Sequence, residues 1–360
     1  MNDLRKKYQA LFFALLTLFL LHVPHEAQAQ EYKFYMGFTP WPDDLTDAAL
    51  RETYGFINQN ATIIAHHFDG GVPWDAALQN SPLPAPLLQD WTHRKNATRH
   101  GMKIFLSVTP LNFGRDGLAL SWNENGDNQP LPQIWQHKGF DDPAVIQAYI
   151  NYVLAAVRFF TPDFLAIGIE SNIMVSKAPE KWPAYLALNK AAYQAVKAEY
   201  PALPVFATVQ YEHLRGIEDE AKPNHALQHD AVAGLMKHAD ALALSTYKYG
   251  MLHPNKISDD YCDEALAFKK PLAIAESGAM SETTVVVGIP LPSNKKTQTN
   301  FTRMILEQAA AHEFLFVINW VAIDFDAMIA KLPKEVRGIA KAWVHTGLLT
   351  KKKKPKPAFE

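Results

Sequence analysis

The chain has 360 residues, 48% of them hydrophobic, and its 35 Lys and Arg residues nearly balance 37 Asp and Glu residues. This composition supports a large folded core, and the formal charge of −2 argues against a nucleic-acid partner, which requires a basic surface. The single cysteine, Cys262, excludes an intrachain disulfide.

Residues 1–29 have the three parts of a secretory signal peptide. Basic residues at positions 5–7 precede the apolar segment Leu11–Leu21, and Ala-Gln-Ala at positions 27–29 forms a cleavage site. The apolar segment is shorter than the roughly 20 residues of a membrane-spanning helix. We therefore expect cleavage after Ala29, no stable membrane span afterwards, and a secreted or periplasmic bacterial protein, since secreted animal domains more often carry disulfides.

Eight short apolar segments follow, and longer helical patterns separate them. Near-continuous apolar runs are typical of parallel strands that are buried on both faces. The intervening segments Pro143–Phe160 and Pro183–Tyr200 carry apolar residues three and four positions apart, as amphipathic helices do. The predicted strands are Tyr32–Phe38, Thr62–Phe68, Lys103–Thr109, Phe164–Glu170, Val205–Tyr211, Ala241–Tyr247, Leu272–Glu276 and Leu315–Trp320.

Strands that alternate with helices predict an α/β protein with parallel pairing, and eight such units close into a (β/α)8 TIM barrel. We expect one barrel over residues 30–348, followed by a polar, Lys-rich tail at 349–360. The alternative, a doubly wound open sheet, usually has a Gly-rich turn after its first strand. The segment Gly37–Pro42 is too bulky for that turn.

Polar and aromatic residues follow the strands at one edge of the predicted barrel. Long loops at 111–142 and 277–300 follow strands three and seven, and this C-terminal face is where barrel enzymes place their active sites. The candidate substrate-binding residues are Trp41, His66, His67, Asn112, Asn172, Gln210, Tyr247 and Trp320. Four loop tryptophans are predicted to stack on sugar rings: Trp41, Trp74, Trp122 and Trp135.

Adjacent residues of a strand point to opposite faces, so only one of His66 and His67 is expected in the site. The other is expected to pack. For the same reason the two imidazoles do not predict a shared metal ion, and we expect neither a metal nor a cofactor.

Glu170 and Glu276 each end an apolar strand, where a carboxylate is costly to bury without partners. Strands four and seven lie on opposite sides of an eight-stranded ring, so two carboxylates can flank one bond. Glycoside hydrolysis uses such a pair, one neutral and one ionised. Strand alternation would place Gly168 on the inward face with Glu170. The structural alternative is that each Glu caps a helix or pairs with a lysine.

Four strand endings resemble those of the clan A retaining glycoside hydrolases: Gly168-Ile169-Glu170, Ser245-Thr246-Tyr247, Ala275-Glu276-Ser277-Gly278 and Trp320. The resemblance implies that Glu170 is the acid/base, Glu276 the nucleophile and Tyr247 its hydrogen-bond partner, with Trp320 beneath the sugar. Within the clan, the nearest resemblance is to the endo-β-1,4-galactanases of glycoside hydrolase family 53. We expect an endo-acting hydrolase of a β-linked polysaccharide or oligosaccharide, and a monomer.

One position departs from the clan pattern. Ile169 stands where the clan carries an Asn that binds the sugar 2-hydroxyl, and Asn172 is the expected substitute. This departure keeps a non-catalytic carbohydrate-binding barrel open as the alternative function, because fold does not fix function. A metal-dependent hydrolase that uses His66 and His67 is the third hypothesis.

Overall fold

The structure, a computed structural model, describes residues 33–217, 225–247 and 260–360. The expected signal peptide lies outside the described residues. Phe34–Glu360 forms one compact unit.

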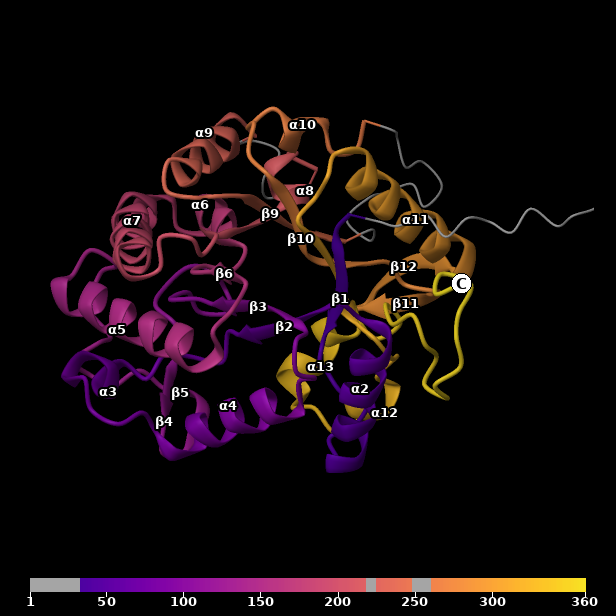
Figure 1. Cartoon of the computed structure of the whole chain (residues 1–360), viewed down its shortest axis with the longest axis horizontal. Coiled ribbons are helices and arrows are strands. Elements are labelled where there is room, and N and C mark those ends of the chain that lie inside the picture. Colours follow the sequence, from indigo (N-terminus) through magenta and orange to yellow (C-terminus); the bar gives the residue numbers. More distant parts are fainter. Residues whose placement is uncertain (1–32, 218–224, 248–259) are drawn as a thin grey trace, which may run out of the picture. The chain divides into compact units, whose positions relative to one another are not determined.

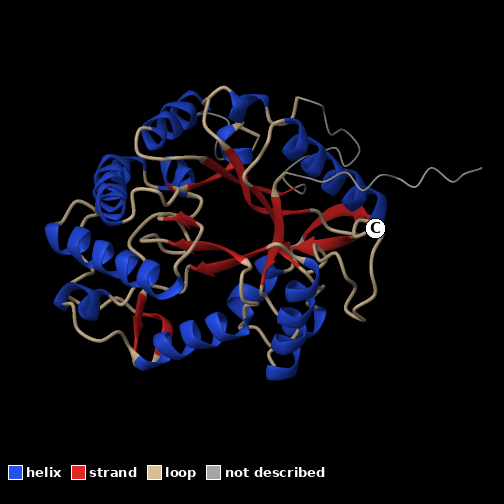
Figure 2. Ribbon diagram, in the orientation of Figure 1, coloured by secondary structure: helices blue, strands red, loops and turns tan. Residues whose placement is uncertain are grey.

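A parallel sheet forms the centre of the unit Phe34–Glu360, and helices surround it (Figures 1 and 2). Its strand order is β7-β6-β3-β2-β1-β13-β10-β9-β8. The two end strands, β7 (Val205–Phe206) and β8 (Thr208–Gln210), are separated only by Ala207. They are therefore two parts of one strand, and the sheet closes into a barrel of eight strands. This confirms the predicted (β/α)8 fold.

The remaining barrel strands are β1 (Tyr35–Thr39), β2 (Ile63–Phe68), β3 (Lys103–Val108), β6 (Phe164–Ala166), β9 (Leu242–Tyr247), β10 (Leu272–Gly278) and β13 (Phe316–Val321). The longer helices are α2 (Asp47–Asn60), α3 (Trp74–Gln79), α4 (Ala85–Ala97), α5 (Pro143–Phe160), α7 (Trp182–Glu199), α9 (His225–Met236), α11 (Lys295–Ala311) and α13 (Lys334–Ala340). Shorter helices are η1 (Ser171–Ile173), α6 (Met174–Lys177), η2 (Pro179–Lys181), α8 (Tyr211–Leu214), α10 (Asp263–Leu266) and α12 (Asp326–Ile329).

All eight predicted strand segments contain observed strands, but the fourth is shorter than expected. β6 ends at Ala166, so strand alternation does not extend to Glu170. A Cβ atom on Gly168 would lie 2.2 Å from the Tyr185 hydroxyl of α7. Gly168 therefore allows a close approach to the surrounding helices, and the expectation that it shares an inward face with Glu170 is wrong.

Aromatic side chains fill one end of the barrel interior. Phe316 of β13 lies 4.8 Å from Phe105 of β3 and 4.9 Å from Phe164 of β6, measured between ring centroids. Strand β13 is adjacent to neither β3 nor β6 in the sheet, so Phe316 meets the other two rings across the interior. All three phenylalanines stand near the start of their strands. They therefore form an apolar layer inside the barrel, below the C-terminal ends of the strands.

Two hairpins extend the loops at the C-terminal face. β4 (Ser121–Asn123) and β5 (Gly126–Gln129) lie in the long loop after strand three. β11 (Glu282–Val286) and β12 (Ile289–Asn294) follow strand seven. Both loops were predicted to be long, and the structure gives each an internal two-stranded sheet.

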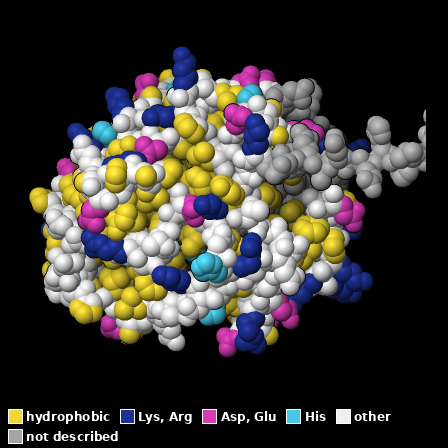
Figure 3. Space-filling view, in the orientation of Figure 1, with side chains coloured by type: hydrophobic (Ala, Val, Ile, Leu, Met, Phe, Trp, Pro, Cys, Tyr) yellow, Lys and Arg dark blue, Asp and Glu magenta, His cyan; other side chains and the backbone are white. Residues whose placement is uncertain are grey.

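Among the described residues, α5 alone is long and apolar enough to cross a membrane. Half of it is buried against the barrel, which is typical of a core helix. On the face shown in Figure 3, basic and acidic side chains are interspersed, with hydrophobic side chains between them.

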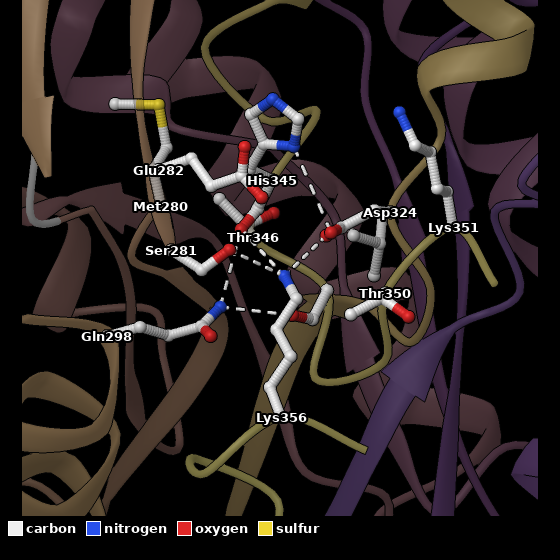
Figure 4. A network of polar contacts seen from close by, with 12 residues as sticks. Met280, Ser281, Glu282, Gln298, Asp324, His345, Thr346, Thr350, Lys351 and Lys356 are labelled. Atoms are coloured by element: carbon white, nitrogen blue, oxygen red, sulfur yellow. Dashed lines mark hydrogen bonds and ion pairs between the residues drawn. The ribbon is translucent and has the colours of Figure 1, made fainter. Parts of the chain in front are cut away.

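The last twelve residues pack partly against the barrel. Lys351–Lys354 are exposed, whereas Lys356 is buried. Its ammonium group donates to Asp324 Oδ1 at 2.7 Å, to Ser281 Oγ at 2.8 Å and to the His345 carbonyl at 3.2 Å (Figure 4). Lys356 therefore ties the final segment to the loops that follow strands seven and eight.

Candidate active site

Glu276 lies within β10, two residues before the strand ends at Gly278, and only 7% of it is exposed. The Tyr247 hydroxyl donates to its Oε2 at 2.8 Å. Burial raises the pKa of Glu276 to about 7, and the negative charge of Glu170 acts in the same direction. His67, the Tyr247 hydroxyl and Arg115 oppose this rise. The site thus contains a carboxyl group that changes its charge near neutral pH.

Glu170 follows β6 with a φ of +48°, a left-handed conformation that is unfavourable for a residue with a side chain. Its N–H donates to Thr208 Oγ1 at 2.8 Å, which holds the backbone in place. Ser245 Oγ donates to Glu170 Oε1 at 2.7 Å. Since strained backbone persists only where its surroundings determine it, these contacts fix the direction of the carboxylate.

Strand β9 brings the two carboxylates together. Ser245, which donates to Glu170, is the register partner of Glu276 on the neighbouring strand. Tyr247, two residues further along, donates to Glu276. Both carboxylates are therefore held by side chains of the same strand, and the charge of Glu170 raises the pKa of Glu276.

His67 lies beside Glu276, with 3.4 Å between its Nδ1 and Glu276 Oε1. Its Nε2 is 3.7 Å from Asp69 Oδ2. Burial lowers the pKa of His67, but the charges of Glu276 and Asp69 outweigh that effect and raise it. Protonated His67 favours the ionised form of Glu276 in return, so the imidazole and the carboxyl group compete for a proton.

His66 lies on the opposite face of β2, as strand alternation predicts. It is fully buried, with its Nε2 3.2 Å from Thr98 Oγ1 and its ring 5.2 Å from that of Phe160. Burial lowers its pKa to about 3, so it stays neutral. His66 is thus the packing histidine, and the structure does not bring it to the site.

Two aromatic side chains stand at the rim. Trp320 of β13 packs edge-on against His67, with the ring centroids 5.1 Å apart. Trp41, which follows β1, is 37% exposed, and its ring centroid lies 6.2 Å from that of Trp320. These two indoles lie where a sugar ring over the carboxylates would meet an apolar surface.

Other predicted substrate ligands are engaged by the protein itself. Asn172 is fully buried, and its side chain bonds to both the N–H and the carbonyl of Gln210 and to Gln228. The Gln210 side chain bonds to Glu212 and His213. The Asn112 side chain bonds to Asp116. Asn172 is therefore not available to replace the amide missing at position 169, where Ile169 is also buried.

Three of the four predicted stacking tryptophans pack inside the loops instead. Trp74 and Trp135 have no exposed surface, and their rings lie 5.4 Å apart. Trp74 Nε1 donates to the Ala119 carbonyl, and Trp135 Nε1 donates to Asp75. Trp122 is 9% exposed. The expectation that these three form sugar platforms is wrong, because Trp74 of α3 and the two tryptophans of the long loop after strand three belong to the buried hydrophobic core.

Arg115 and Glu212 belong to the site region, although no sequence pattern marked them. One Arg115 nitrogen lies 3.6 Å from Glu170 Oε2 and 3.8 Å from Asp69 Oδ2. Glu212 is 1% exposed and accepts hydrogen bonds from the Thr246 hydroxyl and the Tyr247 N–H. A glutamate directly after a predicted strand was the one available signal for Glu212.

One group among the described residues has the spacing of a metal site. Atoms of Asp324, Asp326 and His345 lie within 4.8 Å of one another. The ammonium group of Lys356 is already 2.7 Å from Asp324 (Figure 4). A protein cation therefore neutralises this cluster, which fits a divalent ion poorly.

No family model and no curated protein matches the sequence. The fold matches many solved structures. An exo-β-1,4-mannosidase from Opitutaceae bacterium strain TAV5 has 15% identity and a TM-score of 0.62, covering 91% of this chain and 58% of its own. Xylanase 10B from Thermotoga maritima has 13% identity and a TM-score of 0.57, and the match covers 91% of this chain and 93% of the xylanase.

A GH53 catalytic domain from Ignisphaera aggregans has 15% identity and a TM-score of 0.55, with 91% and 94% coverage. This chain spans little more than half the length of the mannosidase but nearly all of the other two. These similarities confirm the barrel fold that the clan A resemblance implied. The finer resemblance to the galactanases stays a prediction.

Proposed function

We propose that this protein is a β-glycoside hydrolase that acts by double displacement, with Glu170 as acid/base and Glu276 as nucleophile. The observation that carries the proposal is the convergence of the two carboxylates over β9, where Ser245 and Tyr247 hold one each. Glycoside hydrolysis by double displacement requires two carboxyl groups that flank the glycosidic bond to be cleaved.

In the first step, the ionised Glu276 attacks the anomeric carbon while Glu170 gives its proton to the departing oxygen. In the second, water attacks the glycosyl–Glu276 ester, and Glu170 takes the proton of that water. Glu276 must be ionised to begin. The Tyr247 hydroxyl, protonated His67 and Arg115 all favour that form.

The proposed substrate is a β-linked polysaccharide or oligosaccharide. Trp41 and Trp320 support it, because flat apolar rings bind the faces of sugars. We propose endo action on the strength of the two extended loops, together with a monomeric, exported protein. The structural neighbours include a mannosidase and a xylanase, so the substrate panel below includes mannan and xylan.

A non-catalytic carbohydrate-binding barrel is the second candidate. The specific observation in its favour is the burial of Ile169 and the full engagement of Asn172, which leave no amide from either position beside Glu170.

The test is reducing-sugar release from a polysaccharide panel that includes galactan, mannan and xylan, by wild type, Glu170→Gln and Glu276→Gln. The exposed Glu307→Gln on α11 is the matched control. Hydrolysis that falls several orders of magnitude in Glu276→Gln but persists in Glu307→Gln supports the enzyme, because a nucleophile and its charge are lost together. Equal activity in all variants refutes the assignment. Binding without hydrolysis in wild type establishes the second candidate.

A further inference from the structure

Arg115 is a buried cation at the candidate active site whose hydrogen-bonding capacity is incompletely used. Its side chain is 5% exposed. One terminal nitrogen, Nη1, donates to the Asn112 carbonyl at 3.0 Å. Among the described residues, its Nε has no hydrogen-bond partner. An unused donor in a buried guanidinium is costly, because the group has left water without a replacement partner.

The other terminal nitrogen, Nη2, faces two carboxylates without bonding closely to either. It lies 3.6 Å from Glu170 Oε2 and 3.8 Å from Asp69 Oδ2. Both distances exceed those of a charge-assisted hydrogen bond, about 2.7–2.9 Å. Asp69 is 32% exposed and Glu170 is 19% exposed, so the two carboxylates that Nη2 faces border open space.

The loop that carries Arg115 is built to hold this orientation. Leu111 and Leu118 form an isolated antiparallel β-bridge, and the Asn112 side chain forms hydrogen bonds with Asp116. Arg115 itself adopts a φ of +57°. Left-handed backbone at a residue with a long side chain persists only where its surroundings determine it, and such strain gathers at functional sites.

The residues expected to bind a sugar hydroxyl beside Glu170 do not reach it. Ile169 is buried and apolar, and the Asn172 amide is held by other protein groups. Neither position therefore offers a hydrogen-bond donor to a sugar beside Glu170, whereas Arg115 Nη2 lies 3.6 Å from the Glu170 carboxylate.

We propose that Arg115 supplies this donor: its guanidinium donates to a hydroxyl of the sugar held at Glu170, and the same hydroxyl donates to Asp69. This inference rests on the proposed carbohydrate substrate of the site. A hydroxyl group can accept and donate at once, so it fits between a cation and a carboxylate. The charged donor makes that hydrogen bond stronger than an amide would.

The experiment is a double-mutant cycle in which Arg115 is replaced in the protein and single hydroxyl groups are removed from the substrate. The probes are the nitrophenyl β-glycoside that wild type hydrolyses fastest and its single-deoxy derivatives. Wild type is compared with Arg115→Met and with Arg115→Lys, which keeps the positive charge but lacks the several N–H donors of a guanidinium. The control variant is Arg158→Met. Arg158 is 55% exposed and pairs with Glu199, so it controls for loss of a surface cation.

We expect Arg115→Met to lower kcat/KM about 10- to 100-fold on the parent glycoside, as loss of a hydrogen bond from a charged donor does. On one deoxy derivative the same substitution should cost almost nothing, since the partner hydroxyl is already absent. Arg115→Lys should recover only part of the loss. Arg158→Met should behave as wild type.

An equal loss in Arg115→Met on every derivative overturns the contact, because Arg115 would then act on the carboxylates alone. Unchanged kinetics also overturns it. Where wild type binds the glycosides but hydrolyses none, the proposed reaction fails and the same cycle on Kd decides the contact. Where wild type neither binds nor hydrolyses, both proposals fail. A circular dichroism melt of each variant separates misfolding from a local effect.

Discussion

Replacing Glu276 by Gln should stabilise the protein above neutral pH while it removes the proposed activity. Gln keeps an oxygen that can accept from the Tyr247 hydroxyl but carries no charge. Burial has raised the pKa of the native carboxyl group from an ordinary 4.5 to about 7. At about 1.4 kcal/mol per pH unit, that difference corresponds to about 3 kcal/mol.

The folded state binds the proton more tightly, so between about pH 4.5 and 7 the folded protein keeps a proton that the unfolded chain has released. Wild-type stability therefore falls as pH rises through this window. The pKa of His67 is also raised, which adds a loss of the same sign. Relative to wild type, Glu276→Gln should gain about 3 kcal/mol in the free energy of unfolding between pH 4.5 and 8.

The assay is urea unfolding at four pH values across this range, with Glu307→Gln as the exposed control. The control should differ from wild type by a small, constant amount, because its carboxyl group is solvated in both states. A stability difference between Glu276→Gln and wild type that does not change with pH would refute the reasoning. It would mean that ionisation of Glu276 does not oppose folding.

Four further results are expected. Tyr247→Phe removes a hydroxyl that lowers the pKa of Glu276, so the acidic limb of the pH–activity profile, expected near pH 7, should move to higher pH. Lys356→Met should lower the free energy of unfolding in urea by about 3–5 kcal/mol, since its buried aspartate partner loses a cation. Lys351→Met, at a side chain that is 61% exposed, should cost less than about 1 kcal/mol. His66→Gln should keep its kcat/KM within about tenfold of wild type; a larger loss in a folded variant would contradict a purely packing role.

The sequence predicts the barrel well because buried parallel strands leave a local signature. Apolar runs ending in Glu170 and Glu276 placed both carboxylates on one face, and strand alternation separated His66 from His67. Tyr247 and Trp320 follow from the same logic, because the C-terminal ends of parallel strands meet at one edge.

The prediction fails where the backbone leaves regular structure. β6 stops at Ala166, so alternation does not describe Gly168, and Asn172, expected to act from the loop, is held by Gln210 and Gln228 instead. Trp74 and Trp135 read as exposed loop residues, although they pack against each other. Whether a loop folds on itself depends on contacts between residues distant in sequence, which periodicity does not record.

The burial of Lys356 also makes it possible to measure how often the C-terminal segment detaches from the barrel. Lys351–Lys354 are exposed to any amine-reactive reagent, whereas the Lys356 ammonium is buried and held by three acceptors. Acylation of Lys356 therefore requires the segment to leave the barrel, while its neighbours react in the native state. Mass spectrometry of one peptide can compare the two rates, with the exposed lysines as internal standard. The ratio gives the free energy of releasing the segment that joins the loops of strands seven and eight.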